Sequence, residues 1–330
     1  MRKILCAVVK IIIALVIFAG VAFSLTVMVG ADNEDVTPGE LPPVTEVMRE
    51  GFYSFRESID ISAYNIMPEE LSGLFSAVIK DDPYLFYVDG SMSYSYKPGG
   101  AVLSLKPRYK MKGIEVFEAW DECRSYVRMV SSEAMKFENE AERALFLHDY
   151  ICQSFEYDTE LLSDNIFTMI KSGRGTCEAY TDIYTAVLRE CGIEAHFVAS
   201  DTISHIWNYV KIGGEWYHAD LTWDDTDGGI KHRHFLLSDT AAKERGHKDW
   251  YSSVEVKCPS DKYDAGDISI VLHEGRAIGD ADHDDVIGLS DLLTIRLELN
   301  GCAVCSDINS DLLIDGNDAE SLRMLILERK

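Results

Sequence analysis

The spacing of hydrophobic positions changes along the chain and separates strand-like from helix-like segments. Residues 81–110 alternate hydrophobic and polar side chains with a period of two, and turn residues at 89–90 and 98–100 interrupt them. This pattern predicts paired strands. Residues 135–158 repeat their hydrophobic side chains with a period near 3.6, which predicts a helix. A shorter helix-like segment at residues 47–56 precedes the strands.

Residues 173–192, GRGTCEAYTDIYTAVLRECG, predict an amphipathic helix after a glycine-flanked turn. The helix would begin near Cys177 and end at Gly192, because glycine commonly caps helix C-termini. The dipole and free amides of the first turn favour a thiolate at Cys177, and the same amides could stabilise an oxyanion. The hydrophobic face would consist of Ala179, Ile183, Val187 and Leu188.

Residues 205–225, HIWNYVKIGGEWYHADLTWDD, predict two strands joined by a two-residue turn at Gly213 and Gly214. In that register His205 and Asp220 are diagonal neighbours on one face, roughly 7–8 Å apart between backbones. A one-residue bulge would instead place them on opposite faces. Cys177, His205 and Asp220 would together supply a nucleophile, a general base and a residue that orients the base.

Other chemically active residues are more typical of structural roles. His148 belongs to the hydrophobic stripe of residues 135–158, where a histidine is more often a buried core residue than a catalytic one. His218, in the same hairpin as Asp220, favours a structural role as well. The aromatic side chains of residues 81–110 are typical of a core and sheet surface, with a substrate-facing wall as the alternative.

The first 31 residues predict a secretory signal. Arg2 and Lys3 precede an uninterrupted hydrophobic run at residues 11–29, and small residues lead to acidic, polar sequence after Ala31. This order is typical of a signal peptide cleaved after Ala31. The alternative is an uncleaved anchor, since a run of 19 residues can span a bilayer. Both interpretations place the remainder outside the cell, and we expect no membrane association after cleavage.

Charge and cysteine content narrow the function further. A formal net charge of −25 argues against nucleic acid as a partner, because nucleic-acid binding needs clustered Lys and Arg. Cys6 leaves with the signal, so seven of the eight cysteines remain and at least one thiol is expected to be free. Cys302 and Cys305 form a CxxC motif, which favours a local disulfide or two packed thiols over a zinc site.

Two twelve-residue windows with one pattern lie in the acidic segment 279–330. They are DADHDDVIGLSD at 280–291 and DINSDLLIDGND at 307–318, each followed by a hydrophobic helix-like run. Alternating oxygen ligands with a final carboxylate are the arrangement of a calcium loop, in which position seven contributes its backbone carbonyl. The candidate ligands are Asp280, Asp282, Asp284, Val286 and Asp291 in the first window, and Asp307, Asn309, Asp311, Leu313 and Asp318 in the second.

This duplicated pattern resembles the type I dockerin, a secreted module that binds cohesin domains. The resemblance implies a small all-α domain with two Ca²⁺ ions and a cohesin domain of a scaffoldin as partner. It departs at loop position six, where the family has glycine and this chain has Asp285 and Leu312. The second loop is therefore expected to bind calcium more weakly or to bend differently. The positions that face cohesin in the family also differ between the repeats: Leu289 and Ser290 against Gly316 and Asn317.

Residues 135–263 resemble the transglutaminase-like, papain-related superfamily. The segments GTCEAYTDIYTAVLRECGI, HIWNYVKIGGEWYHADLTWDD and HFLLSDTAAKERGHKDW carry the resemblance. It implies an α+β fold with an antiparallel sheet behind the Cys-bearing helix. It also assigns Cys177 as nucleophile, His205 as general base and acid, and Asp220 as the residue that orients His205. Where the family usually has His-Ala-Trp-Asn, this chain has Ile206 as the second residue.

The resemblance leaves the reaction open. Attack of Cys177 on an amide carbonyl would form a thioester, which water hydrolyses or an amine converts to a new amide. We favour a cysteine peptidase or amidase acting on extracellular protein, with plant-wall protein as a candidate substrate, because dockerins mostly assemble wall-degrading complexes. The alternatives are a transglutaminase and a binding or assembly module with a vestigial triad. A glycoside hydrolase is disfavoured, since no pair of carboxylates stands out in residues 135–263.

The expected organisation has five parts. It consists of a signal peptide at 1–31, an accessory α+β region at 32–134, a catalytic domain at 135–263, a linker at 264–278 and a dockerin at 279–330. The protein would be secreted, and a cohesin scaffold could hold it at the cell surface. We expect no cofactor for catalysis.

Overall fold

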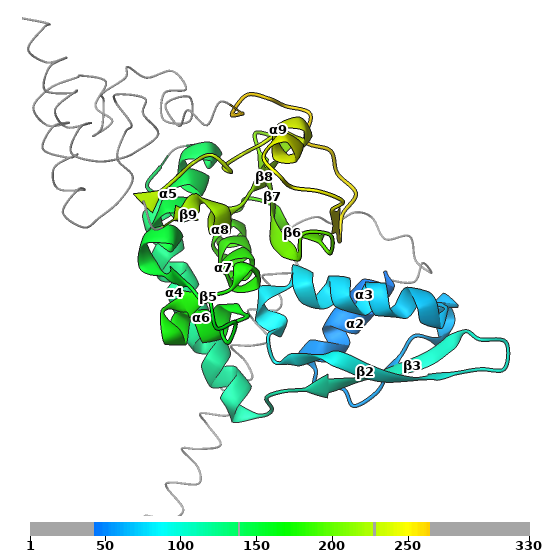
Figure 1. Cartoon of the computed structure of the whole chain (residues 1–330). Helices are drawn as coiled ribbons and strands as arrows, with labels where there is room; N and C mark the ends of the chain where they lie inside the picture. Colours follow the sequence, from blue (N-terminus) through cyan, green and yellow to red (C-terminus); the bar gives the residue numbers. More distant parts are fainter. Residues whose placement is uncertain (1–42, 138, 227–228, 265–330) are drawn as a thin grey trace, which may run out of the picture. The chain divides into compact units, whose positions relative to one another are not determined.

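The computed structural model describes residues 43–137, 139–226 and 229–264 of the 330-residue chain (Figure 1). The predicted signal peptide, most of the predicted linker, both predicted calcium windows, Cys302 and Cys305 lie outside these residues. None of the helices in the described part of the chain is long and hydrophobic enough to cross a membrane.

Helices α2 (Val44–Tyr53) and α3 (Pro68–Asp81) pack against each other and against a three-stranded antiparallel sheet. Two short 3₁₀ turns, η1 (Ser62–Tyr64) and η2 (Pro83–Leu85), flank α3. The strands lie in the order β1 (Ile59–Asp60), β3 (Val102–Tyr109) and β2 (Val88–Tyr96). The buried side chains between them include Met48, Phe52, Ile59, Leu71, Phe75 and Leu105.

The strands predicted within residues 81–110 are confirmed as β2 and β3, and the turn at 98–100 connects them. The turn predicted at 89–90 is wrong, because both residues lie inside β2. The Asp89 carboxylate there accepts a hydrogen bond from the Ser91 amide, and the strand register shifts between Val88 and Met92. The turn-favouring residues thus produce an irregularity within a strand, and pairing with β3 continues past it.

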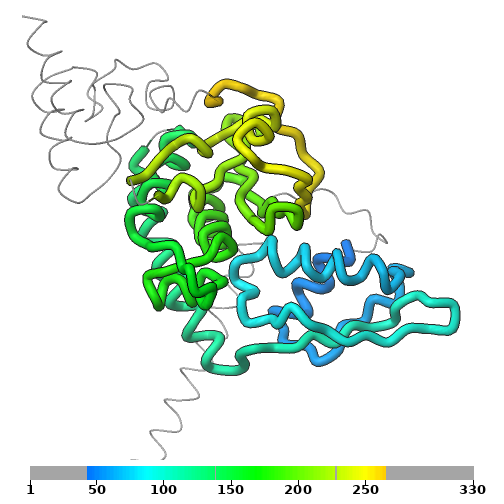
Figure 2. The backbone as a smooth tube through the Cα atoms, in the orientation of Figure 1, coloured from blue at the N-terminus to red at the C-terminus, as the bar shows by residue number. Residues whose placement is uncertain are grey.

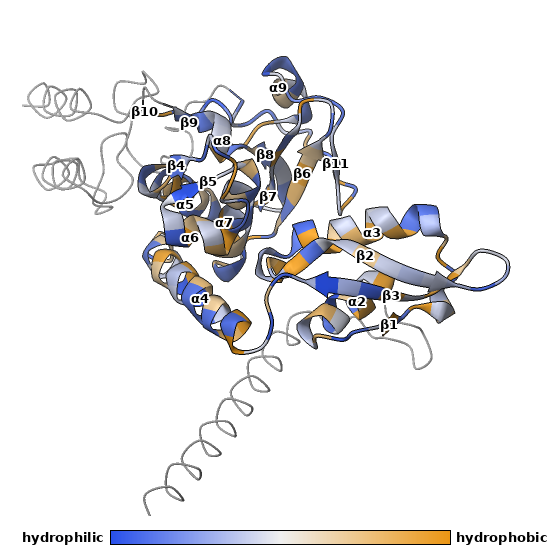
Figure 3. Ribbon diagram, turned by 60° about the horizontal axis from the view of Figure 1, so that its bottom comes forward, coloured by the Kyte–Doolittle hydropathy of each residue, from blue (hydrophilic) through white to orange (hydrophobic). Residues whose placement is uncertain are grey.

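Four helices form the next part of the chain: α4 (Ile114–Ala134), α5 (Glu140–Ser154), α6 (Ile166–Ser172) and α7 (Cys177–Glu190). The helix predicted over 135–158 corresponds to α5 but begins later, because the Asn139 side chain caps α5 by accepting a hydrogen bond from the Glu142 amide. In Figure 3 the ribbon of α4 alternates hydrophilic and hydrophobic stretches, as expected of a helix with one buried face.

A four-stranded antiparallel sheet lies beside α7, in the order β11 (Tyr251–Ser252), β6 (Ala195–Ser200), β7 (His205–Ile212) and β8 (Glu215–Ala219). The predicted hairpin is confirmed: Ile212 pairs with Glu215 and Asn208 with Ala219. Both turn glycines adopt positive φ, 60° for Gly213 and 86° for Gly214. The predicted α+β arrangement, with an antiparallel sheet behind the Cys-bearing helix, is present.

Short elements complete the described chain. A parallel pair joins β4 (Glu156–Tyr157) to β5 (Arg174–Gly175), and an antiparallel pair joins β9 (Asp225–Thr226) to β10 (Gly229–Ile230). Helices α8 (Leu221–Asp224) and α9 (Asp239–Glu244) follow β8 and β10. After α9 the chain, yellow to orange in Figure 2, returns to the sheet, where β11 pairs with β6.

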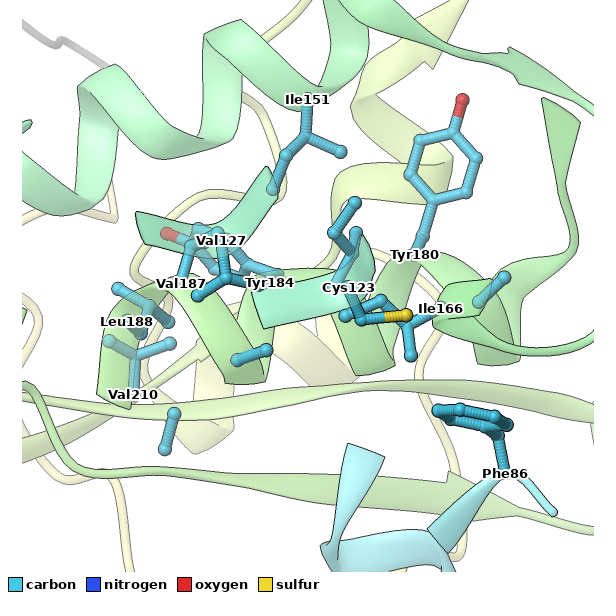
Figure 4. Packing of buried hydrophobic residues seen from close by; sticks show 14 of the residues in the cluster. Phe86, Cys123, Val127, Ile151, Ile166, Tyr180, Tyr184, Val187, Leu188 and Val210 are labelled. Carbon is cyan, nitrogen blue, oxygen red and sulfur yellow. The ribbon is translucent and has the colours of Figure 1, made fainter. Parts of the chain in front are cut away.

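Helix α7 is the centre of the hydrophobic core and is buried over most of its length. It packs against α4, α5 and α6 on one side and against β6 and β7 on the other. Figure 4 shows these side chains meeting around α7, among them Cys123, Val127, Ile151, Ile166, Tyr184, Val187, Leu188 and Val210. Because full burial of such a side chain stabilises the fold by about 1.5–3 kcal/mol, this packing fixes the position of Cys177 at the start of α7.

Candidate active site

Cys177 is the first residue of α7, as predicted, and Thr176 is the N-cap. The entering chain is held from both sides, since Thr176 N donates to Ser163 O (2.8 Å) and Asp158 N donates to Gly175 O (2.9 Å). A Cβ atom on Gly175 would lie 2.6 Å from the Met169 sulfur, so a larger residue would force either Met169 or the turn to shift. Cys177 is therefore placed at a helix N-terminus by a rigid turn.

Cys177 is partly buried, and the other cysteines of the described residues are buried. None of these cysteines forms a disulfide. Burial raises the pKa of the Cys123 thiol to about 12, which makes it a poor nucleophile at neutral pH. Among the described residues, Cys177 is the thiol that solvent and reagents can reach.

His205 is the first residue of β7 and lies between Cys177 and Asp220. Its Nε2 donates a hydrogen bond to Asp220 Oδ2 at 2.7 Å. The other ring nitrogen, Nδ1, is then the one available to the thiol of Cys177. Burial disfavours the imidazolium, but the Asp220 carboxylate and the hydrogen bond with Cys177 outweigh it and raise the pKa of His205 to about 9.

Asp220 directly follows β8 and caps helix α8. One carboxylate oxygen, Oδ1, accepts a hydrogen bond from the Trp223 amide at 3.2 Å. The other, Oδ2, accepts from His205 and also from His247 Nε2 at 2.9 Å. Burial alone would raise the pKa of Asp220, but the His205 charge and the bonds from both histidines lower it well below the usual range. Asp220 is therefore a carboxylate throughout the physiological pH range.

Trp223 and His247 surround His205 and are absent from the sequence-based site. The Trp223 ring stacks on the His205 ring, with centroids 4.9 Å apart and an angle of 8° between planes. His247 is fully buried and also packs against Trp223, at 4.3 Å between centroids. Trp223 is the third residue of α8, and its amide donates to the N-cap Asp220, so its position beside Asp220 follows from local sequence. His247, in contrast, reaches Asp220 through a tertiary contact.

A second buried network of histidines and carboxylates contains His148. Its Nδ1 contacts Asp149 Oδ1 at 2.8 Å and its Nε2 contacts Asp224 Oδ2 at 3.3 Å. His232 Nε2 lies 2.8 Å from the same Asp149 oxygen. Despite its burial, hydrogen bonds and charges from the two carboxylates raise the pKa of His148 to about 9. The prediction that His148 is a buried residue with satisfied polar groups is confirmed.

His218, predicted to be structural, is buried in the hairpin. The indole of Trp207 donates to His218 Nδ1 at 3.0 Å, and His218 Nε2 contacts Asp239 Oδ1 at 3.0 Å. Burial lowers the pKa of His218, which keeps the ring neutral. Both ring nitrogens are thus occupied by partners other than Cys177.

Three groups of side chains in the described residues lie close enough to share a metal ion. They are His148, Asp149 and His232; His205, Asp220 and His247; and His218, Asp239 and Cys258. In each group the histidine nitrogens already face carboxylate oxygens at hydrogen-bond distances. The predicted calcium ligands in residues 280–318 lie outside the described residues.

Comparison with known protein families places this site in a defined class. Residues 128–221 match the model of the transglutaminase-like superfamily, a range that contains Cys177, His205 and Asp220. The chain therefore carries a transglutaminase-like superfamily domain at these residues. No curated protein matches the chain at a significant level.

Several solved structures overlap the chain in part. The crystal structure of a TGase shares 15% identity with it, with a TM-score of 0.32 over 52% of this chain and 56% of that one. A candidate cysteine protease from Cytophaga hutchinsonii shares 13% identity, with a TM-score of 0.28 over 49% and 71% of the two chains. A candidate protease from Parabacteroides distasonis shares 14%, with a TM-score of 0.25 over 40% and 35%.

Proposed function

We propose that the protein is a cysteine-nucleophile acyl-transfer enzyme, and specifically a cysteine peptidase or amidase that cleaves amide bonds in extracellular protein. The observation that carries the proposal is the position of His205. This imidazole interacts with the partly exposed thiol of Cys177 and donates a hydrogen bond to the buried Asp220 carboxylate. Nucleophile, base and orienting residue are therefore contiguous inside a transglutaminase-like domain.

The reaction follows from these contacts. In this proposal Cys177 attacks as a thiolate with the His205 imidazolium beside it. The sulfur attacks the carbonyl carbon of an amide, and free amides at the start of α7 stabilise the oxyanion. His205 gives its proton to the leaving amine as the C–N bond breaks, which leaves a thioester on Cys177. Neutral His205 then takes a proton from water, and the hydroxide equivalent hydrolyses the thioester.

The alkylation rate of Cys177 as a function of pH tests this proposal. Iodoacetamide is used on the wild type and on His205→Ala, and the modified residue is identified by peptide mass spectrometry. We expect the wild type to react well below pH ~8.5, where ordinary thiols lose reactivity, and the variant to lose this behaviour. An unreactive Cys177, or identical profiles for both proteins, would refute the pair and favour a binding module with a vestigial triad.

The fate of the thioester distinguishes hydrolysis from transamidation. Casein is incubated with the enzyme and a labelled primary amine, and the acyl products are analysed by mass spectrometry. The leaving amine or ammonia is released in both cases, but water as the acceptor gives a new carboxylate, whereas the amine as the acceptor gives labelled casein. Cys177→Ser serves as the control for both readouts. We propose water as the acceptor, so incorporation of the amine in excess of hydrolysis would assign the protein as a transglutaminase.

We further propose that the protein is secreted and assembled on a scaffold. This proposal rests on the signal-like residues 1–31 and on the two windows at 280–291 and 307–318, whose oxygen ligands suit two Ca²⁺ ions. The calcium-loaded segment would bind a cohesin domain. Pull-down of the full chain with an immobilised cohesin, with and without a calcium chelator, tests the assignment.

A further inference from the structure

A lysine from the accessory region reaches the surroundings of Cys177. Lys80 lies in the last turn of α3, and its Nζ donates a hydrogen bond to the Tyr251 hydroxyl of β11 at 3.4 Å. The same ammonium lies 5.7 Å from the centre of the Tyr251 ring and 6.0 Å from that of Phe197. Aromatic faces at these distances attract a cation and hold it in place.

The hydrophobic side chains next to Lys80 belong to a cluster that also contacts Cys177. Phe197, Ala199 and Ile206 form a small buried cluster on the sheet, and Ala77 and Cys177 pack against it. Ala77 stands three residues before Lys80 on α3, and residues at this spacing share one face of a helix. Lys80 and Cys177 therefore border the same hydrophobic cluster, with Lys80 above its Phe197 end.

Among the residues that the structure describes, no carboxylate forms an ion pair with the Lys80 ammonium. Its charge is felt at the start of α7, because burial raises the pKa of Glu178 and the Lys80 ammonium is the main opposing influence. The Tyr251 hydroxyl donates its own proton to Asp201 Oδ1 at 3.2 Å, which leaves its oxygen as an acceptor for Lys80.

We propose that Lys80, held by Tyr251, forms an anion subsite beside Cys177 that selects acyl substrates carrying a carboxylate near the amide under attack. The inference rests on the proposed function and assigns its substrate class. A substrate side chain would lie on the cluster formed by Phe197, Ala199 and Ile206 and place its carboxylate next to the Lys80 ammonium. The acceptable carboxylates are those of an acidic side chain or of a peptide C-terminus.

Two alkylating reagents of nearly equal size test the subsite without a known substrate. Iodoacetate carries a carboxylate and iodoacetamide does not, and both react with a thiolate. The ratio of their rate constants at Cys177, divided by the ratio for glutathione, measures selection for the anion. We expect this normalised ratio to fall by about tenfold in Lys80→Gln, because the carboxylate of iodoacetate loses its attraction to one partly screened charge. In Lys80→Glu the ratio should fall further, because the new charge repels the reagent.

Three control variants separate the charge from the packing. Lys80→Arg should keep the ratio, and Tyr251→Phe should keep most of it, because it removes the hydrogen bond and retains the ammonium. Lys211→Gln removes a lysine that also lies over an aromatic ring, 5.3 Å from the centre of Trp216, but is paired with Glu194 near the end of β7 remote from His205. It should leave the ratio unchanged.

The outcomes for the two proposals are distinct. A ratio that is equal in the wild type, Lys80→Gln and Lys80→Glu would overturn the anion subsite even if Cys177 reacts rapidly. If Cys177 reacts no faster than glutathione, the proposed function is refuted. The iodoacetate-to-iodoacetamide ratio can still be measured on such a slow thiol, and it still tests the role of Lys80. If cleavage is established, paired peptides with Glu or Gln beside the amide, and with a free or amidated C-terminus, identify which carboxylate is selected.

Discussion

His205 and His247 donate hydrogen bonds to the same oxygen of Asp220, at 2.7 and 2.9 Å. The second donor is fully buried, and its other ring nitrogen, Nδ1, lies 3.2 Å from the Ala242 carbonyl oxygen. Asp220 is thus fixed from three directions when the Trp223 amide is included. A carboxylate held in this way cannot turn away from His205, so the orientation of the base is set before any substrate binds.

Replacement of the carboxylate should lower the pKa of His205. Asp220 raises that pKa to about 9 against the effect of burial, so in Asp220→Asn the imidazolium should lose its proton at least one pH unit earlier. With iodoacetate, the fall in Cys177 alkylation at alkaline pH should move to lower pH, and the rate at pH 7 should drop by about 10²-fold. The exposed Asp121→Asn on α4 is the control. An unchanged pH profile in Asp220→Asn would contradict this role.

Loss of His247 should destabilise the fold and slow the thiol. In His247→Leu the buried Asp220 loses one of its donors, and an unmade hydrogen bond of this kind costs about 1–3 kcal/mol. In His247→Gln an amide N–H can replace the lost donor, so the loss should be smaller. Urea unfolding at pH 7 gives the free energies, and iodoacetamide alkylation of Cys177 gives the rates. Equal effects of both substitutions would show that volume, rather than the hydrogen bond, is what matters.

Local patterns were sufficient for the elements that position the catalytic residues. Gly213 and Gly214 supply the positive φ angles of a two-residue turn, and the turn alone fixes the pairing of the strands that carry His205 and lead to Asp220. The apolar spacing after Cys177 fixed the start of α7 in the same way. Turn chemistry and helix amphipathicity act over a few residues, which is why they can be interpreted without a fold.

Features that depend on distant contacts could not be predicted. His247 lies 27 positions after Asp220 in the sequence, and although it belongs to a segment that carries the family resemblance, no local pattern indicates that its side chain contacts Asp220. The turn predicted at residues 89–90 failed because strand pairing with β3 outweighs the local preference of Asp89 and Gly90.

Helix α3 was also missed, although Pro68 at its first position and the Glu70 carboxylate bonded to the Met67 amide mark its start.

A side chain at residue 175 should disturb the site without unfolding the protein. In Gly175→Ala the new methyl group would lie 2.6 Å from the Met169 sulfur and 3.0 Å from the Ala179 Cβ, so either the Met169 side chain or the turn before Cys177 must shift. We expect a loss of about 1–3 kcal/mol in stability and a clearly slower alkylation of Cys177. Gly73→Ala within α3 is the control, since nothing lies within 4 Å of its new Cβ. It should stabilise the protein by about 0.5–1 kcal/mol.

The buried network around His148 should make stability depend on pH. Because the folded state raises the pKa of His148 from 6.5 to about 9, its contribution is complete below pH 6.5 and is lost as the pH rises through 9. His148→Gln should lose about 3–5 kcal/mol at pH 7 and show a flatter decline between pH 7 and 9. Unfolding in urea at several pH values measures both quantities.

His234→Gln is the matched control for that experiment. Burial lowers the pKa of His234 to about 4, so this histidine is neutral from pH 7 to 9 and should contribute no pH dependence there. Its substitution should leave the wild-type slope in that range. A His148→Gln protein with the same slope as the wild type would show that His148 is neutral when folded.

Removal of calcium should abolish cohesin binding and leave the reactivity of Cys177 unchanged. The predicted calcium ligands lie in residues 280–318, whereas Cys177, His205 and Asp220 are held by hydrogen bonds and packing within residues 44–264. Addition of a chelator to the full chain should therefore abolish cohesin binding and unfold the last 52 residues. The alkylation rate of Cys177 should stay within about twofold, and Asp280→Ala with Asp307→Ala should reproduce the effect without chelator. Loss of Cys177 reactivity together with cohesin binding would mean that the C-terminal segment supports the catalytic site, and the two functions would then have to be treated as coupled.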